Sequence, residues 1–429
     1  MKKSTLKILF LTLTCVLTLA ACDDPLTTSD TARLTAVIID ISLPDLPEGA
    51  EVADERVTFS NLNSGQSSTF LPDAGISVLP GVYDVSYSAR VFTPGAATTN
   101  LRAKVQSVSI SSATARVELN PYNCIDSDDL IIAEIFFAGT LQPSGNSYIG
   151  DDYIKLYNNT DLTIYADGLT LFESKFLTTR KYAYSPDIMA EAMTVQALYT
   201  IPGSGKEVAV EPGEYLLLAD TGIDHRVANP NSFDLSGADF EWFDQSTVPT
   251  MLDIDGEPAN LDKWYCYTNS VFMLHNRGFR AVGIARIPVD RTHYLENYKY
   301  DYEYDEVTVA GTFPMSQSAY RLPNEWIVDV VNCSVASEYA WQVTASSLDC
   351  GWTACGTIDK DKTRFFHSVR RKLLYVAANG RAVFADTNNS SADFNGNCIA
   401  SEIELQHTAT DVNGTPATSI TYDGVIPRL

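Results

Sequence analysis

The sequence predicts an all-β protein made of two tandem β-sandwich domains with little helix. Short alternating or apolar segments recur between turn residues along most of the chain, which is typical of strands in sandwiches. Residues 130–137 form a continuous apolar run rich in Ile and Phe, interrupted by Glu134, and such a run favours a strand that is buried on both faces. Only residues 186–198 have the composition of a helix, with Ser185 as its N-cap.

The N-terminus has the features of a secretory signal. A basic start is followed by a short apolar stretch, residues 8–21, which is too short to span a membrane. Residues 19–22 read Leu-Ala-Ala-Cys and resemble a bacterial lipobox, in which the cysteine is acylated after cleavage. We therefore expect a signal peptide at 1–21, lipidation of Cys22 and a lipidated tether at 22–32, with the acyl chains holding the protein on a membrane.

Two acids, Asp23 and Asp24, follow the lipidated cysteine. They resemble the surface-export signal of gut Gram-negative anaerobes. This resemblance implies an outer-membrane lipoprotein exposed at the cell surface, while an anchor facing the periplasm stays open as the alternative.

The formal net charge of the chain is −24. Such a surface excludes nucleic acid as a partner, because affinity for nucleic acids comes largely from Lys and Arg near phosphates. An acidic surface is compatible with solubility, with binding of cations, and with attraction of basic partners.

Six cysteines remain once the signal and the lipidated Cys22 are set aside. An even number in an exported chain predicts disulfides, whose pairing the sequence leaves open. A zinc site is not indicated, because the cysteines form no C-x2-C pairs beside histidines. The disulfide candidates are Cys124, Cys266, Cys333, Cys350, Cys355 and Cys398.

Residues 33–122 are predicted to form the first domain, with six or seven short strands. Residues 79–83, Leu-Pro-Gly-Val-Tyr, resemble a turn of transthyretin-like and carboxypeptidase-regulatory modules. The resemblance implies a small immunoglobulin-like sandwich that serves as a spacer.

Residues 123–429 are predicted to form the second domain. Its first strands, within residues 129–171, resemble the opening of a lamin-tail-type β-sandwich, and later landmarks follow in the order of that fold. These landmarks include a glycine hairpin at 210–220, an Ile-Val-Asp strand at 326–331, Ser-Val-Arg-Arg-Lys at 368–372 and an Asp-Thr-Asn-Asn turn from 385. We expect one lamin-tail-like sandwich enlarged by insertions at about 173–208 and 223–320, with the 129–171 strands as scaffold.

The same landmarks resemble, over most of their length, an exported bacterial lipoprotein family known as domain of unknown function 4876. That resemblance implies no defined activity. It implies a place beside outer-membrane receptors, with a TonB-dependent receptor or another outer-membrane barrel as partner.

Motifs for catalysis are missing from the sequence. It contains no Gly-x-Ser-x-Gly, and residues 202–206 lack the pattern of a phosphate-binding loop. Acidic turns could hold a structural calcium ion, a hard cation that takes carboxylate and carbonyl oxygens, and no other cofactor is expected. The weak metal candidates are Asp253, Asp255, Asp386 and Asn388.

Aromatic residues are concentrated in the insertions. Four tyrosines at 298, 300, 302 and 304 alternate with charged residues, so in an extended strand they would form one face. Aromatics with polar tips make good binding surfaces, although they also pack domain cores. The candidate ligand-binding residues are Phe240, Trp242, Phe243, Trp264, Tyr294, Tyr298, Tyr300, Tyr302 and Tyr304.

These observations lead to three hypotheses of function. The favoured one is a non-enzymatic surface lipoprotein that captures a ligand or docks beside an outer-membrane transporter. The alternatives are a structural or adhesive protein that binds host or matrix components, and a carboxylate-based hydrolase. The capture hypothesis expects that Trp242→Ala or Tyr300→Ala weakens ligand binding without unfolding the protein.

Overall fold

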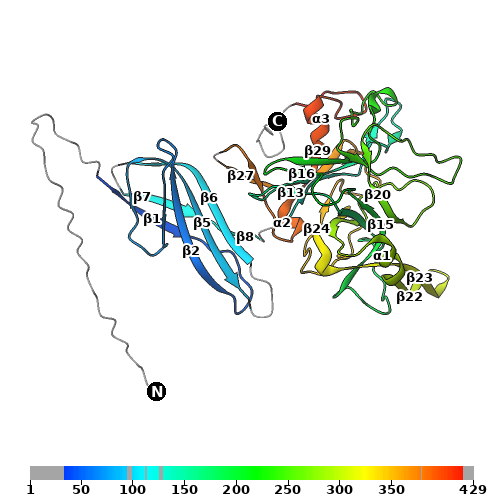
Figure 1. Cartoon of the computed structure of the whole chain (residues 1–429), viewed down its shortest axis with the longest axis horizontal. Helices are drawn as coiled ribbons and strands as arrows, with labels where there is room; N and C mark the ends of the chain where they lie inside the picture. The colour runs from blue at the N-terminus through cyan, green and yellow to red at the C-terminus, as the bar shows by residue number, and fades with distance from the viewer. Residues whose placement is uncertain (1–32, 94–98, 112–113, 125–128, 378, 419–429) are drawn as a thin grey trace, which may run out of the picture.

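The computed structural model describes residues 33–93, 99–111, 114–124, 129–377 and 379–418 (Figure 1). The predicted all-β sandwich fold is confirmed: strands dominate every described region, and the α-helices among them are short. The signal peptide, Cys22 and the tether lie outside the described residues. No helix within the described ranges is long and apolar enough to cross a membrane.

The N-terminal strands form two facing sheets that share one core. The core is apolar and includes Val57, Phe59, Val85, Tyr87 and Leu101. One sheet has the order β4-β1-β7, and the other β3-β2-β5-β6-β8. Their bounds are β1 Thr35–Ile41, β2 Glu51–Asn61, β3 Ser67–Phe70, β4 Ser77–Val78, β5 Gly81–Phe92, β6 Thr99–Ile110, β7 Ala115–Leu119 and β8 Tyr122–Cys124.

The strands after residue 129 form two larger sheets. The first has the order β19-β18-β17-β12-β9-β26-β29. Its strands are β9 Ile131–Phe136, β12 Tyr153–Tyr157, β17 Tyr215–Ala219, β18 Phe240–Glu241, β19 Ala259–Asn260, β26 His367–Arg371 and β29 Phe394–Ile399.

The second large sheet has the order β22-β23-β15-β14-β21-β24-β25. An eighth strand, β20, lies outside this order and pairs with β15. Its strands are β14 Leu169–Ser174, β15 Ala192–Thr200, β20 Asp262–Cys266, β21 Ala281–Arg286, β22 Lys299–Thr308, β23 Gly311–Pro323, β24 Ile327–Ser334 and β25 Thr353–Ala354.

Short elements connect these sheets. The strand pairs are β10 Thr140–Leu141 with β11 Ser147–Tyr148, β13 Ile164–Tyr165 with β16 Ala209–Val210, and β27 Leu373–Val376 with β28 Ala382–Phe384. The helices are η1 His225–Val227, α1 Arg291–Asn297, η2 Asn324–Trp326, η3 Lys362–Arg364, α2 Ser390–Asp393 and α3 Ser401–Gln406.

The main core lies between the two large sheets. Ile135, Ile154 and Leu218 contribute from the seven-stranded sheet, and Leu171 and Ile284 contribute from the other. The outer faces of the sheets are covered as well. Separate apolar clusters fill them, one around Phe136 and Phe233 and one around Phe172 and Tyr294. Because both faces are covered, β9, β12 and β14 are buried along their whole length.

The regions predicted as insertions contribute strands to these sheets. Residues 173–208 supply β15, and residues 223–320 supply β21 and β22. The helix predicted at 186–198 is wrong: residues 192–200 form β15, which is buried throughout and pairs with β14 and β23. Packing on both faces outweighs the moderate helix propensity of its Ala, Met and Leu residues.

The predicted disulfides are not found among the described cysteines. Cys266, Cys333, Cys350, Cys355 and Cys398 are free thiols, and Cys333, Cys355 and Cys398 are buried. The side chain of Cys124 lies outside the described part of the chain. Burial raises the pKa of the Cys333 and Cys355 thiols, so these residues behave as small apolar core residues.

Asp167 fixes the loop that follows β15. Its carboxylate accepts hydrogen bonds from the N–H groups of Gly205 (3.1 Å), Glu207 (3.0 Å) and Val208 (2.9 Å). Burial alone would raise the pKa of Asp167, but hydrogen bonds from Glu207 and its neighbours outweigh burial and hold the pKa below its usual value.

We expect Asp167→Asn to lower the free energy of unfolding at pH 7 by about 1–3 kcal/mol, because three backbone N–H donors lose their charged acceptor. The folded-state pKa is depressed, so this stabilisation is fully present above the unfolded-state value of about 3.9 and is lost as the pH falls below it. Denaturant titrations of both proteins at pH 7 and pH 3 measure the effect. A difference between the two proteins that did not shrink at pH 3 would contradict this assignment.

Candidate functional site

The predicted tyrosine face lies on the hairpin of β22 and β23, at one edge of the eight-stranded sheet. Tyr300, Tyr302 and Tyr304 share one face of β22, as their period of two predicts. Adjacent rings are stacked, with centroids 5.1 Å and 6.1 Å apart. The other face of β22 carries Asp301 and Glu303, which are exposed.

This tyrosine face is covered, in contrast to the open binding surface that was predicted. Phe176 meets Tyr302 edge to face at 5.3 Å, and Tyr182 packs on Tyr304 at 4.5 Å. The hydroxyl of Tyr300 donates to the carbonyl oxygen of Pro186 at 2.5 Å. The residues from 176 to 186 therefore form a lid over the tyrosines, and the rings join the sheet to this segment.

The other aromatic candidates are dispersed through the domain. Phe240 and Trp242 are buried between the large sheets, and Tyr294 is the buried residue of α1. The half-buried ones are Phe243, Trp264, Tyr298 and Tyr304. Trp264 and Tyr298 both pack on Tyr294, at 6.1 Å and 5.2 Å. The nine residues do not form one surface, because most of them fill two separate cores.

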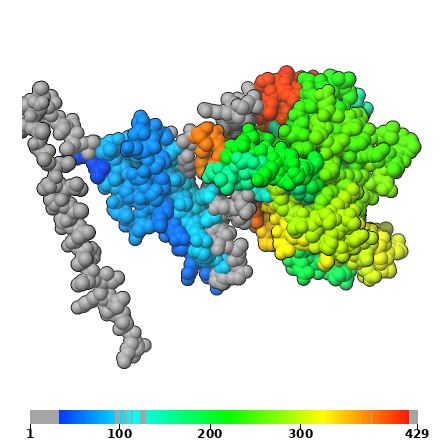
Figure 2. Space-filling model, in the orientation of Figure 1, coloured from blue at the N-terminus to red at the C-terminus, as the bar shows by residue number. Residues whose placement is uncertain are grey.

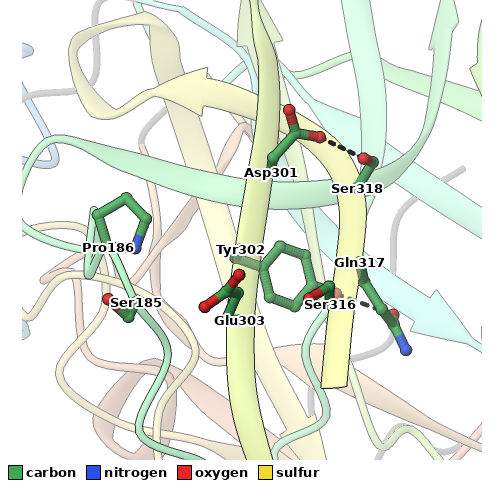
Figure 3. Close-up of a pocket in the computed structure, with 8 residues that line it drawn as sticks. All are labelled: Ser185, Pro186, Asp301, Tyr302, Glu303, Ser316, Gln317 and Ser318. Atoms are coloured by element: carbon green, nitrogen blue, oxygen red, sulfur yellow. Dashed lines mark hydrogen bonds between the residues drawn. The ribbon is translucent and has the colours of Figure 1, made fainter. Parts of the chain in front are cut away.

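A shallow hollow of about 550 Å³ lies beside β22 (Figure 3). It is bordered by the segment at Ser185 and by the exposed face of the hairpin. The N–H and the carbonyl of Ser185 each pair with the backbone of Glu303 at 2.9 Å. The lining residues are Ser185, Pro186, Asp301, Tyr302, Glu303, Ser316, Gln317 and Ser318.

The polar groups of the hollow are arranged in cross-strand pairs. Asp301 lies opposite Ser318 and accepts a hydrogen bond from its hydroxyl. Tyr302 lies opposite Gln317 and donates to its Oε1 at 3.1 Å. The hollow thus combines two carboxylates with hydroxyl and amide groups, a set that can bind hydrogen-bond donors or cationic groups.

The end of the hairpin is apolar and exposed. Val307 is 75% exposed and Phe313 is 47% exposed, and Val309 between them is fully exposed. In the space-filling view, the yellow hairpin projects from the lower right of the domain (Figure 2). An exposed apolar group on a projecting hairpin is typical of a protein contact surface.

The predicted metal residues do not form a ligand cluster. Asp253 accepts hydrogen bonds from the N–H groups of Asp244 and Ile254, and Asp255 accepts from Asn260. Asp386 pairs with Arg371, while the Asn388 amide donates to a carbonyl. No three His, Cys, Asp or Glu side chains are grouped as metal ligands in the described ranges.

A buried Lys–Ser pair is present that the sequence did not suggest. Lys155 donates to the Ser401 hydroxyl at 2.7 Å and pairs with Glu402 at 2.6 Å, while Ser401 donates to Glu134. A Lys–Ser pair can support nucleophilic catalysis where a substrate can reach it. Here all four side chains are buried and Lys155 is paired with Glu402, so this network joins β9, β12 and α3.

Comparisons with known proteins find one family and one solved structure of the same family. Residues 211–401 match the family described as "Protein of unknown function (DUF4876)". The crystal structure of a DUF4876 family protein from Bacteroides thetaiotaomicron VPI-5482 is similar in fold, with a TM-score of 0.56 and 18% identity. The similarity covers 86% of this chain and 95% of that chain. No curated protein matches.

Proposed function

We propose, from the match of residues 211–401 to the DUF4876 family, that this protein docks beside an outer-membrane transporter. In this proposal it is a non-enzymatic lipoprotein, anchored through Cys22 in the outer membrane and exposed at the cell surface. The partner is a barrel of the TonB-dependent type. The lipobox at residues 19–22 and the acids after it support the location.

The observation that carries the docking proposal is the β22–β23 hairpin. Val307, Val309 and Phe313 expose apolar surface at its end. Exposed apolar residues on a projecting element are a frequent centre of protein interfaces, where a few buried side chains supply most of the binding energy.

The charge beside this apolar end indicates which kind of partner surface would bind to it. Asp301, Glu303 and Asp305 occupy the exposed face of β22, next to the hollow. The chain as a whole is strongly acidic, with a net charge of −24. A partner with basic side chains around an apolar patch would be complementary, since opposite potentials favour association.

We expect the double variant Val309→Ser/Phe313→Ser to reduce co-purification of the outer-membrane partner at least about tenfold, because it removes the apolar centre of the contact. The measurement is an affinity pull-down of the full-length lipoprotein from solubilised outer membranes, with quantification of barrel proteins. Val227→Ser is the matched control, since Val227 is 90% exposed but lies on η1, away from the hairpin.

Other results would overturn the docking proposal or favour one of the alternative functions. Equal recovery of the barrel by the hairpin variant and by the unaltered protein would overturn docking through the hairpin. Binding to host matrix in the absence of any barrel partner would favour the adhesive alternative. Turnover of a glycan that Asp301→Asn abolishes would contradict a non-enzymatic role and favour the hydrolase alternative.

A further inference from the structure

Two aspartates lie directly opposite each other at the end of the β12–β17 ladder. The two strands are antiparallel with Tyr153 opposite Ala219, and the Asp220 N–H donates to the Asp152 carbonyl at 2.8 Å. Asp152 and Asp220 therefore continue the register by one pair. Opposed residues project to the same face of a sheet with their Cβ atoms about 5 Å apart, and like charges in this position repel each other.

Both carboxylates are buried, and three of their four oxygens lack a hydrogen-bond donor among the described residues. Asp152 is 0% exposed and Asp220 is 3% exposed. Neither oxygen of Asp152 has a hydrogen-bond partner among the described residues, and the Oδ1 atoms of Asp220 and Asp151 have none there either. Buried polar atoms in folded proteins are nearly always paired, so four unpaired carboxylate oxygens in one region indicate a missing positive partner.

The surroundings of this pair do not supply that partner. The charged groups that act most strongly on Asp152 are Asp220 and Asp151, and those that act on Asp220 are Asp253, Asp151 and Asp244. Desolvation, followed by this repulsion, raises the pKa of both carboxyls well above the usual value.

The two basic side chains of this region are engaged elsewhere. His225 contacts the Tyr148 hydroxyl through Nδ1 and the Thr221 carbonyl through Nε2, both at 2.8 Å. Burial lowers its pKa, so it is neutral near pH 7. Lys263 pairs with Asp244 at 2.8 Å.

We propose that a calcium ion binds between the Asp152 and Asp220 carboxylates. The free donors are all oxygens, and calcium accepts a mixture of carboxylates, main-chain carbonyls and water. Because three acidic side chains are not grouped around one point in the described ranges, two carboxylates and neutral oxygens would form the coordination sphere. Asp151 adds negative charge nearby, while its Oδ2 is held by Thr140 and Ser232 at 2.5 Å each.

The ion would stabilise the loops that leave β17 and β18. Asp220 is followed by Gly222, whose N–H donates to Glu241 at 2.6 Å, and Glu241 also accepts from the Gly256 N–H at 2.6 Å. This arrangement ties the segment after β17 to the acidic turn at Asp253. The turn that the sequence suggested for calcium therefore lies beside the proposed ion without supplying the two bridging carboxylates.

The test compares metal binding by the full chain and by a variant with neutral side chains. Protein dialysed against a chelator is titrated with calcium, magnesium or zinc, and its Tm and bound metal content are measured. We expect calcium at about one hundred times its Kd to raise the Tm of the unaltered protein by about 5 °C. Asp152→Asn/Asp220→Asn should lose this shift, whereas Asp262→Asn, at an exposed aspartate, should keep it.

The chelator comparison on the unaltered protein needs no variant, so a misfolded double variant would not hide the answer. Absence of bound calcium and of any calcium-dependent rise in Tm would overturn the proposal. A double variant more stable than the unaltered protein, without any metal effect, would show instead that protons neutralise the pair. A response to zinc alone, or a calcium response that Asp262→Asn also removes, would likewise overturn it.

Discussion

Arg371→Met is expected to lower the free energy of unfolding of the larger domain by about 3–5 kcal/mol, the cost of leaving buried charges without their partner. The Arg371 side chain is 1% exposed and contacts Asp329 and Asp386, the latter at 3.1 Å. It also donates to the carbonyls of Ile132 (2.7 Å) and Ala385 (2.9 Å). One guanidinium thus joins β9 and β26 of one sheet to β24 of the other.

The pKa shifts of Arg371 and Asp386 also indicate that removal of the arginine would destabilise the protein. Burial lowers the pKa of Arg371, but Asp329 and Asp386 outweigh it and keep the residue charged. Burial raises the pKa of Asp386 to about 7 even with Arg371 beside it. Without the arginine, the Asp386 carboxyl would have to take up a proton or admit water, and Asp329 would lose its cationic partner.

Calorimetric unfolding of the full chain measures this effect as a drop in Tm of about 10 °C. The control is Arg226→Met, since Arg226 pairs with Asp224 and Asp234 while 45% exposed, and such surface pairs contribute at most about 1 kcal/mol. If Arg371→Met and Arg226→Met lowered the Tm equally, the role of Arg371 as a link between the sheets would be wrong.

Arg371 also shows why the resemblance to the DUF4876 family was visible in the sequence. The landmarks at 326–331, 368–372 and 385–394 were recognised as separate motifs, and they supply Asp329, Arg371 and Asp386. In the structure these three side chains meet. Residues that are far apart in the sequence therefore form one interaction. The order of their motifs along the chain was informative about the fold before any contact was known.

The strands were predictable where local pattern decides the structure. The apolar run at 130–137 contains β9 (Ile131–Phe136), and β12 (Tyr153–Tyr157) is one of the strands expected within residues 129–171. The period of Tyr300, Tyr302 and Tyr304 on β22 was also right, whereas Tyr298 lies at the end of α1, outside the strand. Their exposure could not be predicted, because the segment that covers them, with Phe176 and Tyr182, lies more than a hundred residues earlier in the chain.

The hollow and the aspartate pair depend on strand register, which one sequence does not reveal. Asp151 and Asp152 were assigned to the scaffold of residues 129–171. Only the pairing of β12 with β17 places Asp152 against Asp220, which lies 68 positions further along the chain. The hollow likewise requires Ser185 to reach the edge of β22. Such contacts arise from tertiary packing rather than from local composition.

Trp242→Ala, the change first expected to weaken ligand binding, should instead lower the free energy of unfolding by about 3–5 kcal/mol. Trp242 has no exposed surface and packs between the sheets, with its ring 6.4 Å from Phe272. Its backbone N–H donates to the Ala219 carbonyl at 3.1 Å, so the main chain at Trp242 is held beside the end of β17. Truncation would leave a cavity that the two sheets cannot close.

Urea titration of the full chain separates this core role from a surface role. The control is Trp352→Ala, because Trp352 is half-buried and stacks on Tyr339 at 4.3 Å; we expect a loss of about 0.5–1.5 kcal/mol there. Near-equal stability of Trp242→Ala and the unaltered protein would contradict the buried placement and restore Trp242 as a ligand-binding candidate. A large loss means that reduced partner binding by this variant reflects unfolding, so docking has to be tested at the hairpin.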